Sequence, residues 1–392
     1  MTLRQPVTRI RARNFRSLAD VDVRLAPLSV MIGPNGSGKT NLLNVLRFLA
    51  TTVRFDLSAA LQEWRGFDHV QRQSAKPGRV EIEVEGLVTQ FASAGAPDSY
   101  RLHLTPSKQS GIRRSEEFQF KRRGGQGRRI TVSGTQVTIT EEDRETVQHS
   151  LASNQTTGLA TLPRLSDSEG GLGIRRFTEF LSDLRVLEPD VSAAREPSRM
   201  YGSGLADDAS NLADALDRLQ RTDQDAMTAL KSDLSRCLPG FVDILLVPVG
   251  GSARALAVQL VERSLNRPVE LADASFGTVR LLALLTALHE PDPPPFLAIE
   301  EIDHGLHPYA LDILVDRLRA ASQRTQILAA THSPTLVNRL DPAEIIVCDR
   351  DPVTGESLIP AVPAERIALA MRETDWRAGE LWFAGALGGV PR

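Results

Sequence analysis

The feature that most restricts how this chain can fold is a glycine-rich octapeptide between an apolar run and a helix-like pattern. The octapeptide, Gly-Pro-Asn-Gly-Ser-Gly-Lys-Thr at 33–40, matches G-x-x-x-x-G-K-[ST] at every fixed position. Leu28–Ile32 before it has the character of a short buried strand, and leucines at 42, 43, 46 and 49 after it recur at helical spacing. This order of strand, glycine-rich turn and helix predicts a loop that binds polyphosphate.

The chemistry of the loop follows from its residue types. Glycines let consecutive backbone N–H groups face a polyphosphate, and the N-terminus of the following helix adds partial positive charge. Lys39 can reach the terminal phosphates, and the hydroxyl of Thr40 can ligate Mg²⁺. A chance glycine-rich turn is the alternative, and the complete match in this context disfavours it. We therefore expect ATP with Mg²⁺ to be bound by Gly33, Pro34, Asn35, Gly36, Ser37, Gly38, Lys39, Thr40 and Asn41.

A second apolar run ends in two adjacent carboxylates. Phe296–Ile299 has the pattern of a buried strand, and Glu300 and Glu301 follow it directly. Ligands of an open α/β sheet bind outside the carboxyl ends of its strands, where both side chains would lie. We expect Glu300 to share the Mg²⁺ site with Thr40, and Glu301 to orient and deprotonate the attacking water. A solvated acidic turn is the alternative, which the phosphate loop makes weaker.

A third apolar run, Ile327–Ala330, ends in Thr331 and His332. A histidine at a strand end is usually structural, but beside a phosphate loop we expect His332 to sense or polarise the terminal phosphate and the water. The spacing of His304 and His307 also fits a pair of zinc ligands. Further ligands are not found nearby in the sequence, which disfavours a zinc site.

Strand-like and helix-like segments alternate along the chain and predict an α/β fold with a mostly parallel core sheet, an antiparallel N-terminal sheet and a helical insertion. Its expected parts are an N-terminal lobe at 1–140, a helical insertion at 141–240 and a C-terminal lobe at 241–392. Short alternating runs between Val80 and Ile139 predict the antiparallel sheet. Within 141–240 we expect helices at Glu142–Leu151, Phe177–Leu184, Asn211–Leu219 and Gln224–Cys237. Because no heptad pattern is sustained, a long coiled-coil arm is not expected.

Composition places the chain among ordinary globular proteins, with 41% hydrophobic and 24% charged residues. A secretory signal and an apolar stretch able to span a bilayer are not found, so no membrane partner is predicted and the cytoplasm is the expected location. The two cysteines, Cys237 and Cys348, lie far apart in apolar contexts. We interpret both as buried thiols rather than as a disulfide or metal site.

Charge is spread unevenly along the chain. The net charge is −3, but residues 101–130 carry nine basic and two acidic side chains. Two strand-like runs, Glu117–Phe120 and Ile130–Val132, flank a glycine-rich turn there, which predicts a hairpin with a basic tip. Such a tip could contact DNA phosphates, or it could be a solvated loop or a docking site for an acidic protein. The candidate DNA contacts are Lys121, Arg122, Arg123, Arg128 and Arg129.

Taken together, the motifs resemble those of the ABC-type ATPase heads of the SMC, RecF and OLD group. They occur in that group's order, and they are the loop at 33–43, Ser-Phe-Gly-Thr-Val-Arg at 275–280, Glu-Glu-Ile-Asp at 300–303, Gly-Leu-His-Pro at 305–308 and Thr-His-Ser-Pro at 331–334. The opening Arg13-Asn14-Phe15-Arg16-Ser17-Leu18 also looks like the group's N-terminal strand. The resemblance covers 1–50 and 270–392 well and the middle poorly.

The resemblance implies a homodimer that binds ATP between two subunits. In that arrangement Ser275, Gly277 and Arg280 form a signature segment that faces the partner's nucleotide, and Asp303 and His307 lie in a loop that communicates across the dimer. The single glycine of the signature and Glu300 in place of the more frequent Asp depart from the usual pattern. A glutamine of the Q-loop is not placed, and Gln62, Gln71 and Gln73 stay open as alternatives.

The leading hypothesis is an ATP-gated dimer that acts on DNA in repair or anti-phage defence. We expect a separate nuclease or toxin as its effector, because the chain ends soon after 331–334 and leaves no room for a C-terminal nuclease domain. The alternative is the nucleotide-binding subunit of an ABC-type transporter, which a two-glycine signature and a clear Q-loop would favour. A module that binds ATP without turnover is disfavoured by Glu301.

Overall fold

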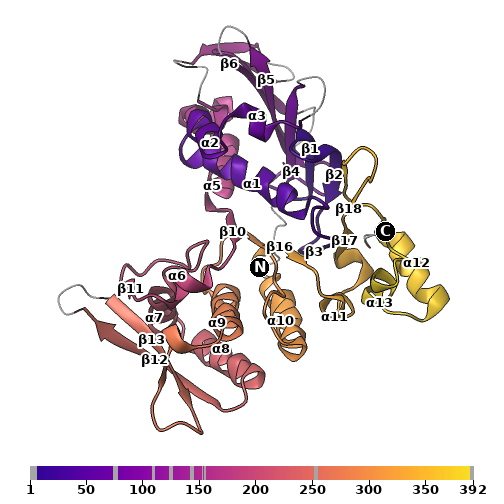
Figure 1. The fold of residues 1–392 in the computed structure, drawn as a ribbon. Helices are drawn as coiled ribbons and strands as arrows, with labels where there is room; N and C mark the ends of the chain where they lie inside the picture. Colours follow the sequence, from indigo (N-terminus) through magenta and orange to yellow (C-terminus); the bar gives the residue numbers. More distant parts are fainter. Residues whose placement is uncertain are drawn as a thin grey trace.

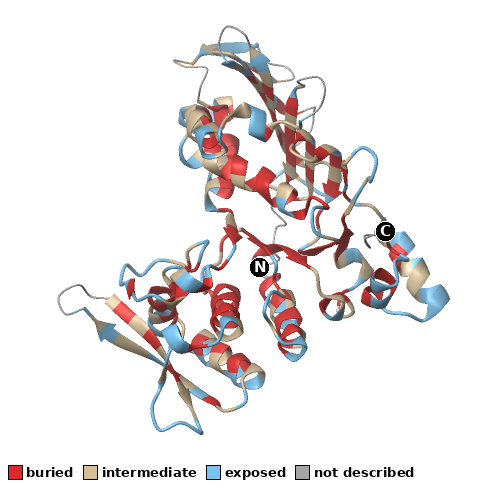
Figure 2. Cartoon of the chain, viewed as in Figure 1, coloured by how far each residue is buried: buried red, intermediate tan, exposed pale blue. Residues whose placement is uncertain are grey.

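A five-stranded parallel sheet lies at the centre of the molecule (Figure 1). The structure is a computed structural model, and it describes residues 7–73, 78–107, 111–122, 127–141, 145–151, 153, 156–250 and 255–388. In sheet order the strands are β10 (Arg185–Leu187), β15 (Phe296–Ile299), β16 (Gln326–Thr331), β3 (Leu28–Ile32) and β17 (Ile345–Val347). Every residue of β3, β15 and β16 is buried, as expected for strands covered on both faces (Figure 2).

An eight-stranded antiparallel sheet forms the upper lobe in the view of Figure 1. In sheet order its strands are β2 (Leu18–Arg24), β1 (Arg9–Phe15), β4 (Val80–Gly86), β5 (Asp98–Ser107), β6 (Gly111–Phe120), β7 (Arg128–Ser133), β8 (Gln136–Glu141) and β9 (Val147–Ser150). Buried and more exposed residues alternate along β5 and β6, because one face of the sheet packs on helices and the other faces solvent.

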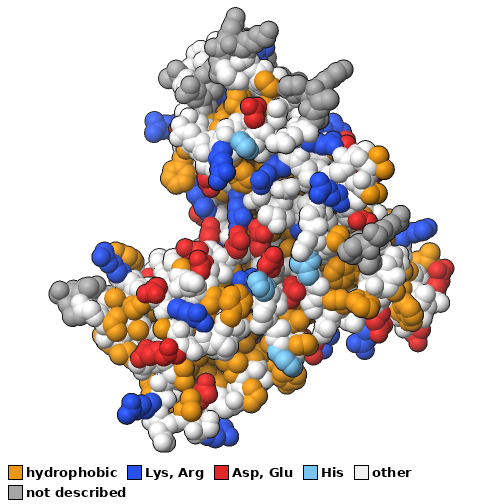
Figure 3. Space-filling model, viewed as in Figure 1, with side chains coloured by type: hydrophobic (Ala, Val, Ile, Leu, Met, Phe, Trp, Pro, Cys, Tyr) orange, Lys and Arg blue, Asp and Glu red, His pale blue; other side chains and the backbone are white. Residues whose placement is uncertain are grey.

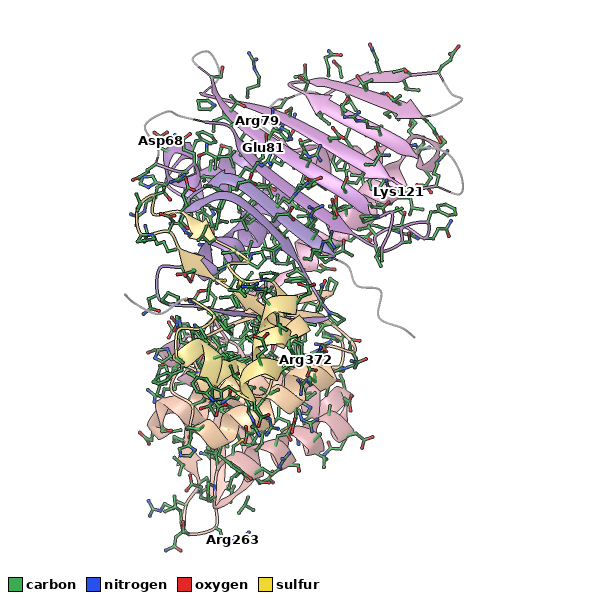
Figure 4. All side chains as sticks on the ribbon, turned by 90° about the vertical axis from the view of Figure 1, so that its right-hand side faces the viewer. Asp68, Arg79, Glu81, Lys121, Arg263 and Arg372 are labelled. Atoms are coloured by element: carbon green, nitrogen blue, oxygen red, sulfur yellow. The ribbon has the colours of Figure 1, made fainter. Side chains whose placement is uncertain are left out.

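The inner face of this sheet shares one hydrophobic cluster with two helices, α1 (Lys39–Arg54) and α5 (Gly171–Asp183). The outer face carries charged pairs across neighbouring strands, such as Arg101 of β5 with Glu83 of β4. Figure 4 shows Arg79 and Glu81 on this sheet, and their side chains form an ion pair of 3.0 Å. The smaller helices of this lobe are α2 (Leu57–Glu63), α3 (Phe67–Val70), α4 (Gly158–Thr161), η1 (Leu162–Arg164) and η2 (Asp167–Glu169).

The lower lobe packs around α9 (Phe276–His289), in which every residue from Val279 onward is buried. Its other helices are α6 (Val191–Arg195), α7 (Leu212–Thr222), α8 (Gln224–Cys237), η4 (Leu271–Asp273), α10 (Pro308–Ala321) and α11 (Pro334–Val337). A small sheet of β11 (Ser198–Arg199), β12 (Phe241–Val249), β13 (Ala255–Glu262) and β14 (Val269–Glu270) flanks them. The chain then continues through η5 (Pro342–Glu344), β18 (Asp349–Arg350), β19 (Ser357–Leu358), α12 (Ala364–Thr374) and α13 (Ala378–Phe383).

The predicted α/β class with a parallel core and an antiparallel sheet is confirmed, but the expected helix at 142–151 is wrong. Residues 147–150 form β9, which pairs antiparallel with β8. Pairing along an open sheet edge outweighs the helix preference of this Glu- and Arg-rich stretch. The stretch 141–240 is also divided, because α5 packs in the upper cluster and α7 and α8 pack in the lower one.

The two cysteines are free, and their burial differs from what we expected for one of them. Cys348 is fully buried, and burial raises its pKa to about 12. Cys237 is only half-buried, with its pKa raised to about 11 mainly by burial. Across the described ranges, no helix is long and apolar enough to cross a membrane.

Candidate active site

Two glycines of the phosphate loop sit where a side chain has no room. A Cβ on Gly33 would lie 2.1 Å from the carbonyl oxygen of Cys348, and one on Gly38 would lie 2.2 Å from the hydroxyl oxygen of Ser357. Gly38 also has a φ of 104°, a left-handed conformation that glycine adopts without strain, and it caps the N-terminus of α1. The C-terminal segment thus fixes the loop between β3 and α1.

Lys39 is turned toward the loop itself. Its ammonium nitrogen lies 2.8 Å from the carbonyl oxygen of Gly33 and 3.0 Å from that of Pro34. The residue is only 7% exposed, and burial lowers its pKa. These contacts hold a positive charge beside the backbone N–H groups that start α1, which suits the binding of phosphate.

Thr40 and Glu300 lie together as expected for the two protein ligands of Mg²⁺. The Thr40 hydroxyl donates to Glu300 Oε2 at 3.1 Å. The other carboxylate oxygen, Oε1, is buried and accepts no hydrogen bond, although the guanidinium of Arg47 lies 3.1 Å away. Burial raises the pKa of Glu300, and Arg47 opposes that change. A hydroxyl and one carboxylate fit Mg²⁺, which takes few protein ligands and completes its shell with phosphate and water.

Glu301 follows in a strained turn. Its φ is 45°, which is unusual for a residue with a side chain, and its carboxylate is 55% exposed. Glu301 Oε2 lies 3.1 Å from Nδ1 of His304. Such strain persists only where surrounding contacts impose it, and here Arg280 supplies them.

Arg280 is placed differently from the expectation that it faces a partner subunit. Its guanidinium donates to the carbonyl oxygens of Glu300 at 3.0 Å and of Glu301 at 2.9 Å. A third bond runs to the carbonyl oxygen of Pro189 at 3.2 Å. Arg280 is only 4% exposed, so its guanidinium is buried within its own subunit, where it holds the backbone at Glu300 and Glu301.

His332 is fixed through Asp303. Asp303 Oδ1 accepts from the hydroxyl of Thr331 at 2.6 Å and from the backbone N–H of His332 at 3.1 Å. Burial lowers the pKa of His332, and the positive charge of Lys39 lowers it further. Both effects favour the neutral imidazole, because the ordinary pKa of histidine is already near 6.5. Asp303 therefore holds the backbone at Thr331 and His332 within its own chain.

The phosphate loop, the two glutamates and His332 border one cavity of about 230 Å³, whereas Arg280 and Asp303 lie behind its lining. Figure 3 shows acidic side chains close to basic ones in the hollow between the two lobes. The cavity is lined by Asn35, Gly36, Gly38, Lys39, Thr40, Asn41, Glu300, Glu301, Ala330 and His332. Segments that are up to 297 positions apart in sequence, Asn35 and His332, thus meet at the carboxyl edge of the parallel sheet.

The signature segment lies outside this cavity, at the exposed start of α9. Ser275 caps the helix by accepting the backbone N–H of Thr278 at 3.2 Å. A Cβ on Gly277 would lie 2.5 Å from the carbonyl oxygen of Gly305, so the signature packs directly on the loop that follows Glu301. His307 in the same loop caps α10 by accepting the backbone N–H of Tyr309.

Sequence reasoning missed two charged residues beside Glu300. Arg47 lies two helical turns after Lys39, and Glu188 directly follows β10, which pairs with β15. The glutamines considered for the Q-loop lie elsewhere, since Gln71 and Gln73 line a separate cavity of about 360 Å³ and Gln62 lies on α2. Within the described ranges, no cluster of three or more metal-ligating side chains is found, at His304 and His307 or elsewhere.

The basic hairpin has the predicted strands, β6 and β7, but Arg128 contradicts the expectation of an exposed tip. Arg128 is only 4% exposed. Its guanidinium pairs with Glu141 at 3.0 Å and donates to the carbonyl oxygens of Asp167 at 3.2 Å and Ser168 at 2.6 Å. Arg128 is thus an internal anchor for the loop before α5 and cannot reach a phosphate backbone.

Two of the remaining cations are also paired. Arg122 pairs with the same carboxylate as Arg128, and Arg129 pairs with Glu117 at 2.7 Å. Lys121 directly follows β6, at the end of the sheet opposite Arg79 (Figure 4). Arg123 falls outside the described residues. Carboxylates on neighbouring strands therefore offset much of the charge that the sequence suggests.

The family of the chain follows from a match that spans most of it. Residues 28–338 match the family described as "AAA domain, putative AbiEii toxin, Type IV TA system". The chain belongs to this family. Together with the relatives below, this match identifies the AAA domain as an ABC-type ATPase head of the SMC, RecF and OLD group.

Curated relatives of this AAA protein carry the names OLD and RecF. It is 24% identical over 368 residues to an OLD nuclease of Thermus scotoductus, which covers 88% of this chain and 62% of that protein. It is 24% identical over 345 residues to the DNA replication and repair protein RecF of Salinibacter ruber. This match covers 86% of this chain and 67% of that protein. The chain therefore spans less than two thirds of the length of the OLD nuclease.

Solved structures of SMC heads share the fold. One, bound to the C-winged helix domain of ScpA, superposes with a TM-score of 0.59 at 16% identity and covers 94% of this chain and 99% of that chain. Another is the Smc head domain with an extended coiled coil, bound to the C-terminal domain of ScpA and derived from Pyrococcus furiosus. It superposes with a TM-score of 0.55 at 14% identity and covers 95% of this chain and 100% of that chain. These likenesses establish the architecture of the head.

Proposed function

We propose that this protein binds ATP with Mg²⁺ and hydrolyses it as one half of an ATP-gated homodimer. One observation carries the proposal, namely that the phosphate loop, two carboxylates and a histidine border a single cavity. Each of these groups lies at the carboxyl end of a parallel strand, where ligands of such sheets bind. A loop with a purely structural role would need none of the other groups.

Different residues of the cavity have different roles in the proposed hydrolysis. Lys39 and the N-terminus of α1 provide positive charge for the phosphates, and bound Mg²⁺ would polarise the terminal phosphate. The exposed carboxylate of Glu301 can take a proton from a water at the rim of the cavity. Neutral His332 can hydrogen-bond to the water or to the phosphate without adding charge.

The place of the signature segment supports a dimer. Ser275 and Gly277 lie outside the cavity of their own subunit, and the exposed helix start that they form is suited to meet an anion. In a two-subunit arrangement they would complete the cavity of the partner. ATP buried between two subunits adds its binding free energy to association, so the dimer should depend on nucleotide.

Light scattering tests the dimer. The Glu301→Gln protein should double its mass on addition of Mg²⁺ and ATP, because slow hydrolysis preserves the closed state. Adding Ser275→Arg should keep it monomeric, since the larger side chain obstructs the partner's phosphate. Ser235→Arg, at an exposed serine on α8, is the matched control and should still dimerise. A mass that ATP leaves unchanged in the Glu301→Gln protein would refute the dimer.

We further propose that this ATPase acts on DNA, in repair or anti-phage defence, with a separate nuclease or toxin as effector. The names of the relatives, an OLD nuclease and a DNA replication and repair protein, support this proposal. The pairing of Arg122, Arg128 and Arg129 means that the β6–β7 hairpin gives it little support. No specific observation favours a transporter subunit.

DNA stimulation of turnover tests this proposal. ATP hydrolysis should rise several-fold when duplex DNA is added at low salt, and the rise should fade as salt is increased, because phosphate contacts release counterions. Poly-glutamate of similar charge is the control for a general polyanion effect. Equal rates with and without DNA, together with no DNA binding at low salt, would contradict it.

A further inference from the structure

We propose that Arg47 is a positioning residue that controls access of the divalent cation to Glu300, and that it does so as a counter-ion shared with Glu188. This inference rests on the proposed nucleotide function. The guanidinium of Arg47 lies between the two carboxylates, with Nη1 3.1 Å from Glu300 Oε1 and Nη2 2.9 Å from Glu188 Oε2.

The topology explains why two carboxylates meet at this place. β10 and β15 pair in parallel with Leu187 opposite Ile299. The residues that follow, Glu188 and Glu300, are therefore neighbours at the carboxyl edge of the sheet. Two negative charges so close repel each other. The charge of Glu188 therefore adds to the rise in the pKa of Glu300 that burial causes. A cation between them removes that conflict.

Arg47 reaches this point because of its spacing on α1. It lies seven residues after Thr40, about two helical turns, so both side chains project from the same face of the helix. Thr40 occupies one oxygen of Glu300 and Arg47 faces the other. The carboxylate is thus held in place from both sides, with its buried Oε1 accepting no hydrogen bond.

The arrangement has a consequence for the order of binding. A divalent cation at Glu300 must compete with the positive charge of Arg47, and it gains an advantage only when phosphates supply further negative charge. Glu188 is 60% exposed and can retain the guanidinium when Glu300 turns to the metal. Arg47 therefore makes Glu300 a metal ligand that works together with nucleotide and weakly without it.

Mn²⁺ binding measured by the loss of the free-ion EPR signal tests the inference without turnover. In the presence of ADP, Arg47→Gln should bind Mn²⁺ about tenfold more tightly, because a competing charge is removed. Without nucleotide, the variant should bind Mn²⁺ more tightly than the unaltered protein, which binds it only weakly. Glu188→Gln should shift Mn²⁺ affinity the other way, weakening it several-fold, because Arg47 is then left with Glu300 as its carboxylate.

Two controls separate this role from a structural one. Arg54→Gln, on the same helix but bonded to the carbonyl oxygens of Ser182 and Leu184, should leave Mn²⁺ affinity unchanged. Arg47→Lys, which keeps the charge, should stay close to the unaltered protein and also serves if Arg47→Gln fails to fold. Shifts of the same sign in Arg47→Gln and Glu188→Gln would overturn the inference while ADP binding stands. Failure of the unaltered protein to bind ADP would overturn the proposed function and the inference with it.

Discussion

Replacing Glu301 by glutamine should leave ATP binding close to that of the unaltered protein and slow turnover by about 10²–10⁴-fold, the usual contribution of a general base. The amide has the size of the carboxylate but cannot take a proton from water. The side chain is half-exposed, and its carboxylate lies against His304 rather than against the phosphate loop, so its replacement should not disturb that loop. Calorimetric titration with ATP and single-turnover hydrolysis measure the two quantities separately.

Two further variants separate the loss of the Glu301 carboxylate from the loss of its neighbours. His304→Gln removes the partner of the carboxylate and should lower turnover far less than Glu301→Gln does. Glu300→Gln should instead weaken the binding of nucleotide with Mg²⁺, because it replaces the carboxylate beside Thr40. Turnover at the unaltered rate in Glu301→Gln would show that another group activates the water.

Replacing Lys39 by alanine should abolish ATP binding in the micromolar range. The ammonium is buried beside the loop, and losing one partner of a buried, hydrogen-bonded charge pair costs about 2–5 kcal/mol, or roughly 30- to 5,000-fold in affinity. Titration calorimetry with ATP measures the loss. Micromolar ATP affinity that survives in Lys39→Ala would place the nucleotide elsewhere.

The state of His332 shows whether the Lys39→Ala protein is still folded around its site. Removing the lysine should raise the pKa of His332, because the charge of Lys39 is the second cause of its depression after burial. The imidazole signal in an NMR titration, assigned with His332→Gln, reports this without nucleotide. In the unaltered protein the folded pKa lies below 6.5, so this group contributes stability that is lost as pH falls through 6.5 and below.

Two positions of the candidate site could be predicted because each of them directly follows a fully buried run. Glu300 and His332 come after β15 and β16, and the carboxyl ends of parallel strands meet at one edge. Glu188 could not be found in this way, because β10 has three residues and gives little pattern. Its importance arises from the register with β15, which only the three-dimensional structure shows.

Charges were the least predictable part of the molecule. Counting cations in 101–130 cannot reveal that Arg128 lies opposite Glu141 in the register of β7 and β8. Arg280 shows the same limit. The segment that starts at Ser275 resembles a signature that faces a partner subunit, but this resemblance does not indicate where the guanidinium of Arg280 points. In both cases the guanidinium of a buried arginine donates to carbonyl oxygens that are distant in sequence.

The contact between Gly277 and Gly305 bears on the timing of hydrolysis. Because Gly277 has no Cβ, the backbone at the start of α9 packs directly on Gly305. Gly305 belongs to the turn that begins four residues before it, at Glu301. The surface proposed to meet a second subunit is therefore in backbone contact with the turn that carries the group proposed to activate water. A shift of the start of α9 on dimer formation would press directly on Gly305 and so move the backbone that positions Glu301.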